Sequence, residues 1–569
     1  MTKLRSARWF EAPTRMGHTH RQRILQGGFE RQDFAGKPVV AILSTWSDLN
    51  PCHAHFRERA EDVKRGVWEA GGFPVEIPVM ALGEPFVKPT AMLYRSLLAI
   101  QTEESLRCHP VDGAVLMGGC DKTMPGLLLG AISMGLPSIF LPSGPMLTGR
   151  WRGQAMGSGT DTAKAFLDWK AGVLSDADFA TLEEAGARSP GHCMTMGTAS
   201  TMTALADAMG WSPTGASSIP APDSRHRHMA VRVGRRAVEM IREDFRPDKL
   251  TTKAAFHNAI VTLLALGGST NAVIHLIALA RRAGLNLGLD DFDHLSRKVP
   301  VLADMRPSGR FLMEDFFEAG GLRGLLSRLG DLLDLDAITL SGRTLGAEIA
   351  DAPVWSDEVI RPRSRPLRES GGLAILRGNL APDGAVLKVS AASPHLLRHV
   401  GPALVFEGWA DFAARIDAPD LPADENTVLV LRNCGPKGAP GMPEWGMMQV
   451  PKKLLERGVR DIVRVSDARM SGTHFGTVVL HAAPEAAIGG PLALVRDGDM
   501  IELDAEARAI SLRVDAGELD KRRAAWRAPE LKHARGWAKM YTDHVEQADQ
   551  GADLDVLGHR PASPEPEIN

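Results

Sequence analysis

Short apolar runs alternate with longer, helix-like segments in the first third of the chain. The runs at 37–46, 111–119 and 136–144 are rich in β-branched residues and end at Gly, Pro or Ser, which predicts buried strands. The segments between them, such as 54–70 and 90–108, have the apolar spacing of helices. This alternation predicts a parallel α/β sheet, in which ligands collect at the carboxyl ends of the strands.

From about residue 335 the pattern changes to short strand-like runs separated by Gly, Asp and Asn turns, with little helix between them. These runs are 337–346, 371–380, 384–390, 426–433, 461–470, 477–486 and 497–514. They predict a second domain that is a mostly-β barrel or sandwich. The Pro-rich, charged segment 351–366 is the expected linker between an N-terminal α/β domain, residues 1–350, and a C-terminal domain, residues 367–569.

The most apolar long stretch, 259–280, is interrupted by Gly-Gly-Ser-Thr-Asn at 267–271 and by His275. These interruptions predict a buried helix, or two helices around the Gly-Gly break, and not a membrane span. The N-terminal residues also lack the apolar run of a secretory signal.

The composition excludes several classes of protein. The chain has 569 residues, too many for one core, with the 44% hydrophobic and 24% charged residues of an ordinary globular protein. A net charge of −3 gives no reason to expect nucleic acid or an anionic membrane as a partner. Five scattered cysteines, an odd number, fit no disulfide framework. We therefore expect a cytoplasmic protein with reduced thiols.

Three of the cysteines lie in glycine-rich or loop-like surroundings: Cys52 in "NPCHAH", Cys120 in "GGCDK" and Cys193 in "PGHCMTMGTAS". A free cysteine is more often a small buried hydrophobic residue, and that interpretation suits Cys108 and Cys434. Three thiolates that converge from separate loops would suit an iron–sulfur cluster with one iron open to substrate.

Zinc is the alternative for the first of these loops. Cys52, His53 and His55 could all be zinc ligands. Neither an HExxH motif nor paired CxxC motifs accompany them, so zinc ranks below the iron–sulfur interpretation.

Three acids, Glu84, Asp121 and Glu444, lie among Gly, Pro and apolar residues. Each is most simply a solvated surface charge, but together they would form an oxygen-ligand site for Mg²⁺. Lys122 does not fit such a site as an ammonium, because it would repel the metal ion. It either pairs with Asp121 or carries a carbamate, which would make it another oxygen ligand.

Ser471 lies in "SDARMSGTHFG", between two strand-like runs. The ordinary interpretation is a hairpin turn formed by Ser and Gly. A serine hydroxyl acts as a base only where a nearby metal or cluster stabilises its alkoxide. A catalytic role for Ser471 therefore requires the two domains to close over the metals.

Seven segments resemble the dihydroxy-acid and sugar-acid dehydratase family, in the family's order and over most of the chain. They are "NPCHAH", "LGEPFVKPTAMLYRSLLA", "DGAVLMGGCDKTMPGLLLGA", "GHCMTMGTASTM", "LALGGSTNAVIHL", "GPKGAPGMPEW" and "SDARMSGTHFGTVVLHAAPEA". The resemblance implies an N-terminal α/β domain, a C-terminal β-barrel and a homodimer or homotetramer. It also implies these roles: cluster ligands Cys52, Cys120 and Cys193; Mg²⁺ ligands Glu84, Asp121, carbamylated Lys122 and Glu444; the base Ser471, with Thr473 close to the substrate.

The implied reaction is the loss of water from a 2,3-dihydroxy carboxylate to give a 2-oxo-3-deoxy acid. The motif forms resemble the pentonate branch, which acts on L-arabinonate or D-xylonate. The alternatives are a dehydratase for 2,3-dihydroxyisovalerate or a range including glycerate, a zinc hydrolase, and a non-enzymatic iron–sulfur sensor. Either cluster type can keep one iron open, and [2Fe–2S] is favoured over [4Fe–4S]. His53, His55 and His474 are candidates for binding the distal hydroxyls.

Overall fold

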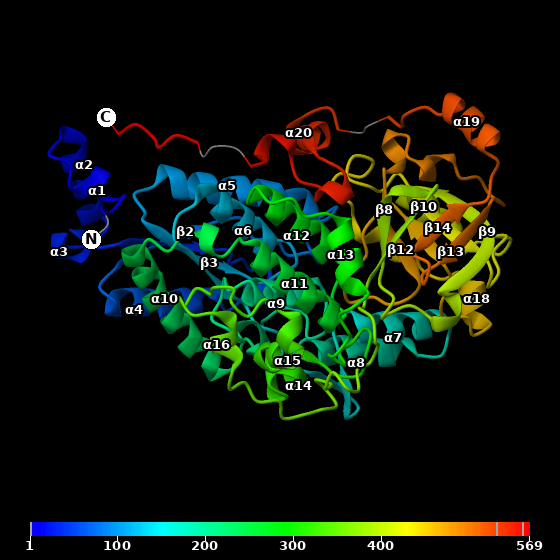
Figure 1. Ribbon diagram of the computed structural model, residues 1–569, viewed down its shortest axis with the longest axis horizontal. Coiled ribbons are helices and arrows are strands. Elements are labelled where there is room, and N and C mark those ends of the chain that lie inside the picture. The colour runs from blue at the N-terminus through cyan, green and yellow to red at the C-terminus, as the bar shows by residue number, and fades with distance from the viewer. Residues whose placement is uncertain (1–2, 531–532, 560–562, 569) are drawn as a thin grey trace.

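The computed structural model describes residues 3–530, 533–559 and 563–568. Two bodies lie side by side along the long axis: an α/β body from the N-terminal half and a β-barrel from the C-terminal half (Figure 1). The predicted fold class is therefore confirmed. None of the helices in the described ranges is long and apolar enough to cross a lipid bilayer.

A four-stranded parallel sheet forms the centre of the α/β body, in the order β2-β1-β3-β4. Its strands are β1 (Val39–Ser44), β2 (Phe73–Pro78), β3 (Gly113–Gly118) and β4 (Ser138–Pro142). The strands β1, β3 and β4 are fully buried and coincide with the three predicted runs. The sequence pattern does not reveal β2, because this edge strand, FPVEIP, contains two prolines and a glutamate.

Helices cover both faces of this sheet. The longer helices around it are α4 (Phe56–Glu69), α5 (Arg95–Cys108), α6 (Thr123–Met134), α9 (Thr198–Ala208), α10 (Ser224–Glu243), α11 (Lys253–Leu266), α12 (Asn271–Arg282) and α13 (Leu289–Ser296). Shorter or peripheral ones are α1 (Ala7–Phe10), α2 (Arg15–Gln26), α3 (Arg31–Phe34), α14 (Met313–Glu318), α15 (Gly321–Leu329) and α16 (Leu345–Ile349). The pair α4 and α10 lies on one face of the sheet, and the pair α5 and α6 lies on the other (Figure 1).

The apolar stretch 259–280 spans the end of α11 and most of α12. Gly267 ends α11 with a φ of 57°, in the left-handed region that favours glycine. The prediction of two helices around the Gly-Gly break is confirmed.

Eight strands close the barrel in the order β10-β11-β12-β8-β7-β14-β13-β9. They are β7 (Ala374–Gly378), β8 (Ala381–Leu387), β9 (Arg398–Glu407), β10 (Val428–Arg432), β11 (Arg464–Ser466), β12 (Val478–Ala483), β13 (Met500–Asp504) and β14 (Ala509–Leu512). Every predicted run from residue 371 onward overlaps at least one of these strands. The short helices α17 (Trp409–Arg415) and α18 (Lys452–Glu456) pack outside the barrel.

One strand prediction is wrong, and one strand of the barrel has no clear signal in the sequence. The run 337–346 is not a strand, because Ile338 and Thr344 pair only as an isolated bridge around a tight turn at Gly342. The sequence pattern does not predict β9, because Gly401 and Pro402 interrupt its apolar run.

Alternate residues of two strands connect the barrel to the α/β body. Ile375 of β7 and Val386 of β8 belong to the hydrophobic core of the α/β body. Leu376 and Leu387, next to them in the sequence, fill the barrel interior. Because successive side chains of a strand face opposite sides, β7 and β8 serve both cores and hold the two bodies together.

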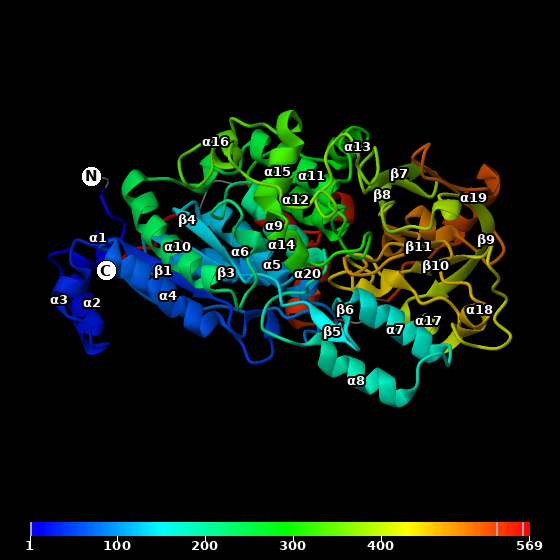
Figure 2. The ribbon, with the colours of Figure 1, turned by 90° about the horizontal axis from the view of Figure 1, so that it is seen from below.

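Two further segments cross between the bodies. The hairpin of β5 (Gly149–Trp151) and β6 (Gln154–Met156), with α7 (Thr160–Lys170) and α8 (Asp176–Gly186), projects beside the barrel (Figure 2). After α19 (Ala516–Ala525), the chain returns through α20 (Gly536–His544) to the α/β body, where Asp553 accepts a hydrogen bond from Ser96 at 2.8 Å (Figure 1). The end of the barrel-side sequence thus packs against the first body.

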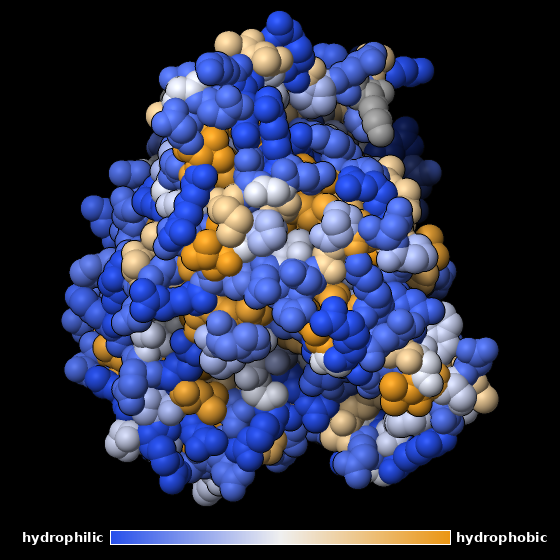
Figure 3. All heavy atoms as spheres, turned by 90° about the vertical axis from the view of Figure 1, so that its right-hand side faces the viewer, coloured by the Kyte–Doolittle hydropathy of each residue, from blue (hydrophilic) through white to orange (hydrophobic). Residues whose placement is uncertain are grey.

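The barrel end of the molecule presents a mainly hydrophilic face (Figure 3). Its hydrophobic residues form small groups separated by hydrophilic ones.

Candidate active site

Loops at the carboxyl ends of the sheet strands carry most of the predicted site residues. Following β1, β2 and β3 in turn are Cys52, then Glu84, then the adjacent Cys120, Asp121 and Lys122. The loop that carries Cys193 docks at the end of β4, where the His192 N–H donates to the Gly144 carbonyl at 3.0 Å. The ends of all four strands therefore meet around one site, as expected for a parallel sheet.

The three predicted cluster ligands, Cys52, Cys120 and Cys193, are brought together and are called here the thiol set. The neighbouring Cys120 thiol, together with burial, raises the pKa of Cys52 well above its usual value. Burial raises the pKa of Cys193 to about 12. Cys52 and Cys193 therefore hold their protons at neutral pH unless a metal ion takes the place of those protons. Cys108 and Cys434 lie elsewhere, on the end of α5 and in an apolar cluster beside the barrel.

His53 supports the Cys120 loop. Its Nε2 accepts a hydrogen bond from the Cys120 N–H at 3.0 Å, so Nδ1 carries the proton and donates to the Thr45 carbonyl, also at 3.0 Å. Burial lowers the pKa of His53 to about 3, so the ring is neutral. Both ring nitrogens already have hydrogen-bond partners, so His53 has no nitrogen available for zinc or for a substrate hydroxyl.

The other two candidate histidines differ in position. His55 Nε2 lies 3.0 Å from the Ser143 carbonyl, within the α/β body. The backbone N–H of His474 donates to the Ser471 carbonyl at 3.1 Å, and its Nδ1 has no hydrogen-bond partner in the described ranges. Of the three, His474 is the one beside Ser471.

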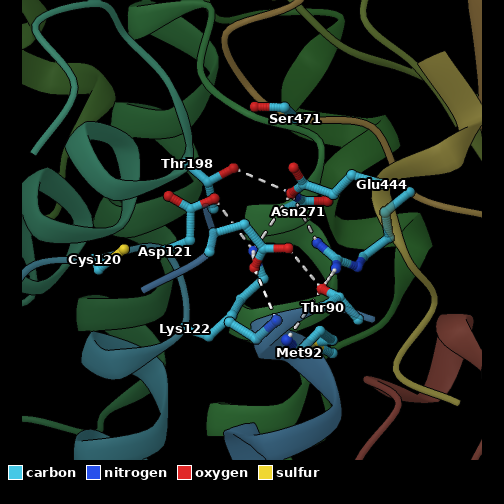
Figure 4. Close-up of polar contacts among 12 residues, drawn as sticks. Thr90, Met92, Cys120, Asp121, Lys122, Thr198, Asn271, Glu444 and Ser471 are labelled. Carbon is cyan, nitrogen blue, oxygen red and sulfur yellow. Dashed lines mark hydrogen bonds and ion pairs between the residues drawn. The ribbon is translucent and has the colours of Figure 1, made fainter. Parts of the chain in front are cut away.

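The Lys122 ammonium lies among the three predicted carboxylates, Glu84, Asp121 and Glu444, called here the carboxylate set. Figure 4 shows Lys122 with Asp121 and Glu444. Its Nζ is 3.3 Å from Asp121 Oδ2, 3.5 Å from Glu444 Oε1 and 3.8 Å from Glu84 Oε2. Within residues 3–530, 533–559 and 563–568, no three His, Cys, Asp or Glu side chains share a metal-binding point as they stand. Instead, the Lys122 ammonium occupies the space between the three carboxylates.

Asn271 and Arg469 hold the barrel-side acid, and sequence reasoning gave neither of them a role. Asn271 Nδ2 and Arg469 Nη1 each donate to Glu444 Oε1 at 3.1 Å. The other oxygen, Oε2 of Glu444, and Oδ1 of Asp121 accept no hydrogen bond from any described residue. Each of these two acids thus has one carboxylate oxygen that could bind a metal ion, water or substrate.

The two ends of the carboxylate set differ in charge. Burial raises the pKa of Glu84, and the neighbouring carboxylates add to this rise. Burial also opposes ionisation of Glu444, but Lys122 and Arg469 outweigh it and hold the pKa of Glu444 below its usual value. Glu444 is therefore the firmly ionised member of this pair.

Ser471 lies on a loop where the barrel touches the α/β body. Gly472 approaches that body so closely that a Cβ on it would lie 2.6 Å from the Thr198 backbone nitrogen, so only glycine fits. Ser471 Oγ lies 3.1 Å from Thr473 Oγ1, and the Thr473 N–H points to Ser471 Oγ at 3.4 Å. The Thr473 carbonyl in turn accepts a hydrogen bond from Thr160 at 2.6 Å. The loop thus holds the serine hydroxyl near the carboxylate set (Figure 4).

Comparison with known proteins agrees with this arrangement. The family description "dihydroxy-acid/6-phosphogluconate dehydratase" matches the chain twice, with its N-terminal part over residues 37–348 and its C-terminal part over residues 358–552. Together these matches cover most of the chain, and they follow the division into α/β body and barrel.

Three curated relatives match nearly the whole chain. The 6-deoxy-6-sulfo-D-gluconate dehydratase of Pseudomonas putida is 52% identical over 100% of this chain and 98% of the relative. The L-arabinonate dehydratase of Rhizobium leguminosarum bv. trifolii (strain WSM2304) is 52% identical over 98% of this chain and 96% of the relative. The dihydroxy-acid dehydratase of Pyrobaculum neutrophilum is 38% identical over 97% of this chain and 98% of the relative. The chain therefore belongs to the dihydroxy-acid/6-phosphogluconate dehydratase family, a family of hydro-lyases, as its motifs predict.

Proposed function

We propose that this protein removes water from a 2,3-dihydroxy sugar acid to give a 2-oxo-3-deoxy acid. One observation carries the proposal: the adjacent residues Cys120, Asp121 and Lys122 join the thiol set to the carboxylate set, opposite Ser471 on the other body. Soft and hard metal ligands in one loop suit a reaction in which two Lewis acids act on one substrate.

The thiol set fits an iron–sulfur cluster. Its thiols influence one another electrostatically and come from three loops, and the raised pKa values of Cys52 and Cys193 mean that cluster binding would release protons. A [2Fe–2S] cluster remains our preferred type. Analysis of iron and sulfide in anaerobically prepared protein would distinguish it from [4Fe–4S].

The carboxylate set fits Mg²⁺ if Lys122 carries a carbamate. Replacing the ammonium by a carbamate changes the local charge from +1 to −1, and Mg²⁺ then adds +2, so the net charge of the pocket is unchanged. The unshared oxygens of Asp121 and Glu444 supply further hard ligands. The ligands would then be Glu84, Asp121, carbamylated Lys122 and Glu444.

Bound at these positions, the cluster and Mg²⁺ would supply Lewis acids that polarise the C3 hydroxyl and the carboxylate end of the substrate. The chain's own residues perform the proton transfer. Ser471 Oγ would remove the C2 proton as an alkoxide that the nearby Lewis acids stabilise, and the Thr473 N–H and hydroxyl would add hydrogen bonds to Oγ. The electron pair of the C2–H bond would form the C2=C3 bond of an enol as the C3 hydroxyl departs as hydroxide, which takes up a proton to become water. The enol would then tautomerise to the 2-oxo acid.

For the substrate we propose an aldonate, with a pentonate such as L-arabinonate or D-xylonate first. The support is that relatives at 52% identity are named for L-arabinonate and for 6-deoxy-6-sulfo-D-gluconate, both sugar acids. The relative named as a dihydroxy-acid dehydratase is less similar, at 38%. His474, beside Ser471, is our candidate for binding a distal hydroxyl.

The test is formation of 2-oxo acid by anaerobically reconstituted protein with Mg²⁺. The substrates are L-arabinonate, D-xylonate, 6-deoxy-6-sulfo-D-gluconate, D-glycerate and 2,3-dihydroxyisovalerate. The highest kcat/KM on a pentonate supports the proposal in full. Preference for the sulfonated hexonate would show that the substrate has six carbons and not five. Preference for dihydroxyisovalerate would overturn the sugar-acid assignment. No product from protein with an intact cluster would overturn the proposed reaction.

We further propose a cytoplasmic homodimer or homotetramer. All five cysteines are free, and a cluster held by thiolates suits a compartment that keeps thiols reduced. Light scattering of the reconstituted protein gives the subunit number.

A further inference from the structure

The Thr90 hydroxyl has a fully determined hydrogen-bond arrangement. Arg469 Nη2 at 2.9 Å and the Met92 backbone N–H at 3.2 Å can only donate to it. A hydroxyl has one proton and two acceptor lone pairs, so its proton must point to its third neighbour, Glu84 Oε1, at 2.7 Å. Thr90 is completely buried, so water does not compete for these bonds.

Arg469 connects this hydroxyl to the barrel side. Its Nη1 donates to Glu444 Oε1 at 3.1 Å while Nη2 donates to Thr90. The guanidinium is completely buried and planar, so its two donors have a fixed relative position. One continuous chain of hydrogen bonds therefore runs from Glu84, through Thr90 and Arg469, to Glu444.

This chain crosses between the two bodies. Glu84 and Thr90 lie on the loop that follows β2 of the sheet, whereas Arg469 and Glu444 belong to the barrel half. The remaining oxygen of Glu84, Oε2, accepts from the Ala91 N–H at 3.1 Å, so both oxygens of this acid are fixed. The orientation of Glu84 relative to Glu444 thus depends on Thr90 and Arg469.

We propose that Thr90 and Arg469 are positioning residues that fix the orientation of Glu84 and Glu444, the two outer carboxylates of the proposed divalent-cation site, relative to each other. This inference rests on the proposed Mg²⁺ site. Hydrogen-bond partners of metal ligands usually affect metal affinity by about 10–100-fold, and here the partners also come from opposite bodies. Divalent-cation affinity would then report on the closure of the barrel against the sheet.

The test compares Thr90→Val with Thr90→Ser in reconstituted protein. Valine keeps the shape and removes the hydroxyl, whereas serine keeps the hydroxyl and removes only a methyl group. The readouts are Mn²⁺ affinity by electron paramagnetic resonance, iron content, and kcat and KM separately. We expect Thr90→Val to weaken Mn²⁺ binding by about 10–100-fold with iron content unchanged, and Thr90→Ser to bind within about threefold of the unsubstituted protein.

A double substitution sharpens the test. If Thr90 and Arg469 act through one chain, Thr90→Val combined with Arg469→Lys weakens Mn²⁺ binding little more than Arg469→Lys alone. Unchanged Mn²⁺ affinity in Thr90→Val overturns the inference and leaves the proposed function standing. Equal losses in the valine and serine variants also overturn it, because the hydroxyl is then not the cause. If the unsubstituted protein binds no Mn²⁺, the proposed cation site fails, and this inference fails with it.

Discussion

The thiol set and the carboxylate set touch each other through Cys120 and Asp121, yet they are built differently. All three cysteines belong to loops of the α/β body, at the ends of one sheet. The carboxylate set combines two acids of that body with Glu444 from the barrel half, held there by Arg469 and Asn271. The soft-ligand site is therefore complete in one body, whereas the hard-ligand site exists only when the two bodies meet.

The electrostatics of the two sets differ in the same way. Within the thiol set, Cys52 and Cys193 have raised pKa values and are neutral until a metal binds. Among the carboxylates, Glu444 is held ionised by the buried cations Lys122 and Arg469. One set thus depends on its cofactor for its charge, while the other carries compensated charge within the protein.

The largest effect is expected from breaking the thiol set. Cys120→Ser should remove the cluster and with it all measurable turnover, because serine lacks the soft thiolate that iron prefers. Iron analysis and visible absorbance check this. Cys108→Ser is the matched control, since this exposed thiol lies outside the set. A red-brown, active Cys120→Ser protein would contradict the proposed ligand set.

Removing the base should cost less than removing the cluster. Ser471→Ala should lower kcat by about 10²–10⁴-fold, the usual contribution of a positioned general base. Because Ser471 belongs to neither set, iron content and Mn²⁺ affinity should both be unchanged. Steady-state kinetics with the best substrate of the panel measures the drop, and a kcat within threefold of the unsubstituted protein would exclude Ser471 as the base.

A smaller effect, on stability, is expected from replacing Lys388. The two buried lysines Lys122 and Lys388 differ in whether they have charged partners. Lys122 lies among three carboxylates, but Lys388 Nζ has no hydrogen-bond partner in the described ranges, and burial lowers its pKa to about 7. Between this value and the usual lysine pKa of about 10.4, the unfolded chain holds a proton that the folded chain has released. The free energy of unfolding should therefore rise with pH across that window.

Lys388→Met should remove this pH dependence and stabilise the protein at pH 7. The gain is on the order of a few kcal/mol, at about 1.4 kcal/mol per unit of pKa shift. Urea unfolding of both proteins at pH 7 and pH 10 provides the comparison. If the stability of Lys388→Met changed between pH 7 and pH 10 by as much as that of the unsubstituted protein, Lys388 would have a partner in solution.

Much of the fold could be predicted from local patterns, and the exceptions have physical causes. Buried strands such as β1 and β3 are apolar on both faces, so their runs are visible in the sequence. The strands β2 and β9 contain prolines at positions where the sheet tolerates them, which hides the pattern.

The site could be predicted only in part. Its candidate ligands stand out because Cys, Asp and Lys follow a strand directly in "GGCDK". Thr90, Asn271 and Arg469 carry no such local signal, because their roles depend on contacts between the two bodies. No periodicity reports that Asn271 of α12 meets Glu444 of the barrel half at 3.1 Å.

The most direct test of the contrast between the two sets is to measure iron content and Mn²⁺ affinity together in Glu444→Gln. This substitution keeps the size of the side chain and removes the charge contributed from the barrel half. We expect unchanged iron content and visible absorbance, with Mn²⁺ affinity lowered at least about tenfold. Loss of iron along with Mn²⁺, or Mn²⁺ binding as tight as before, would contradict it.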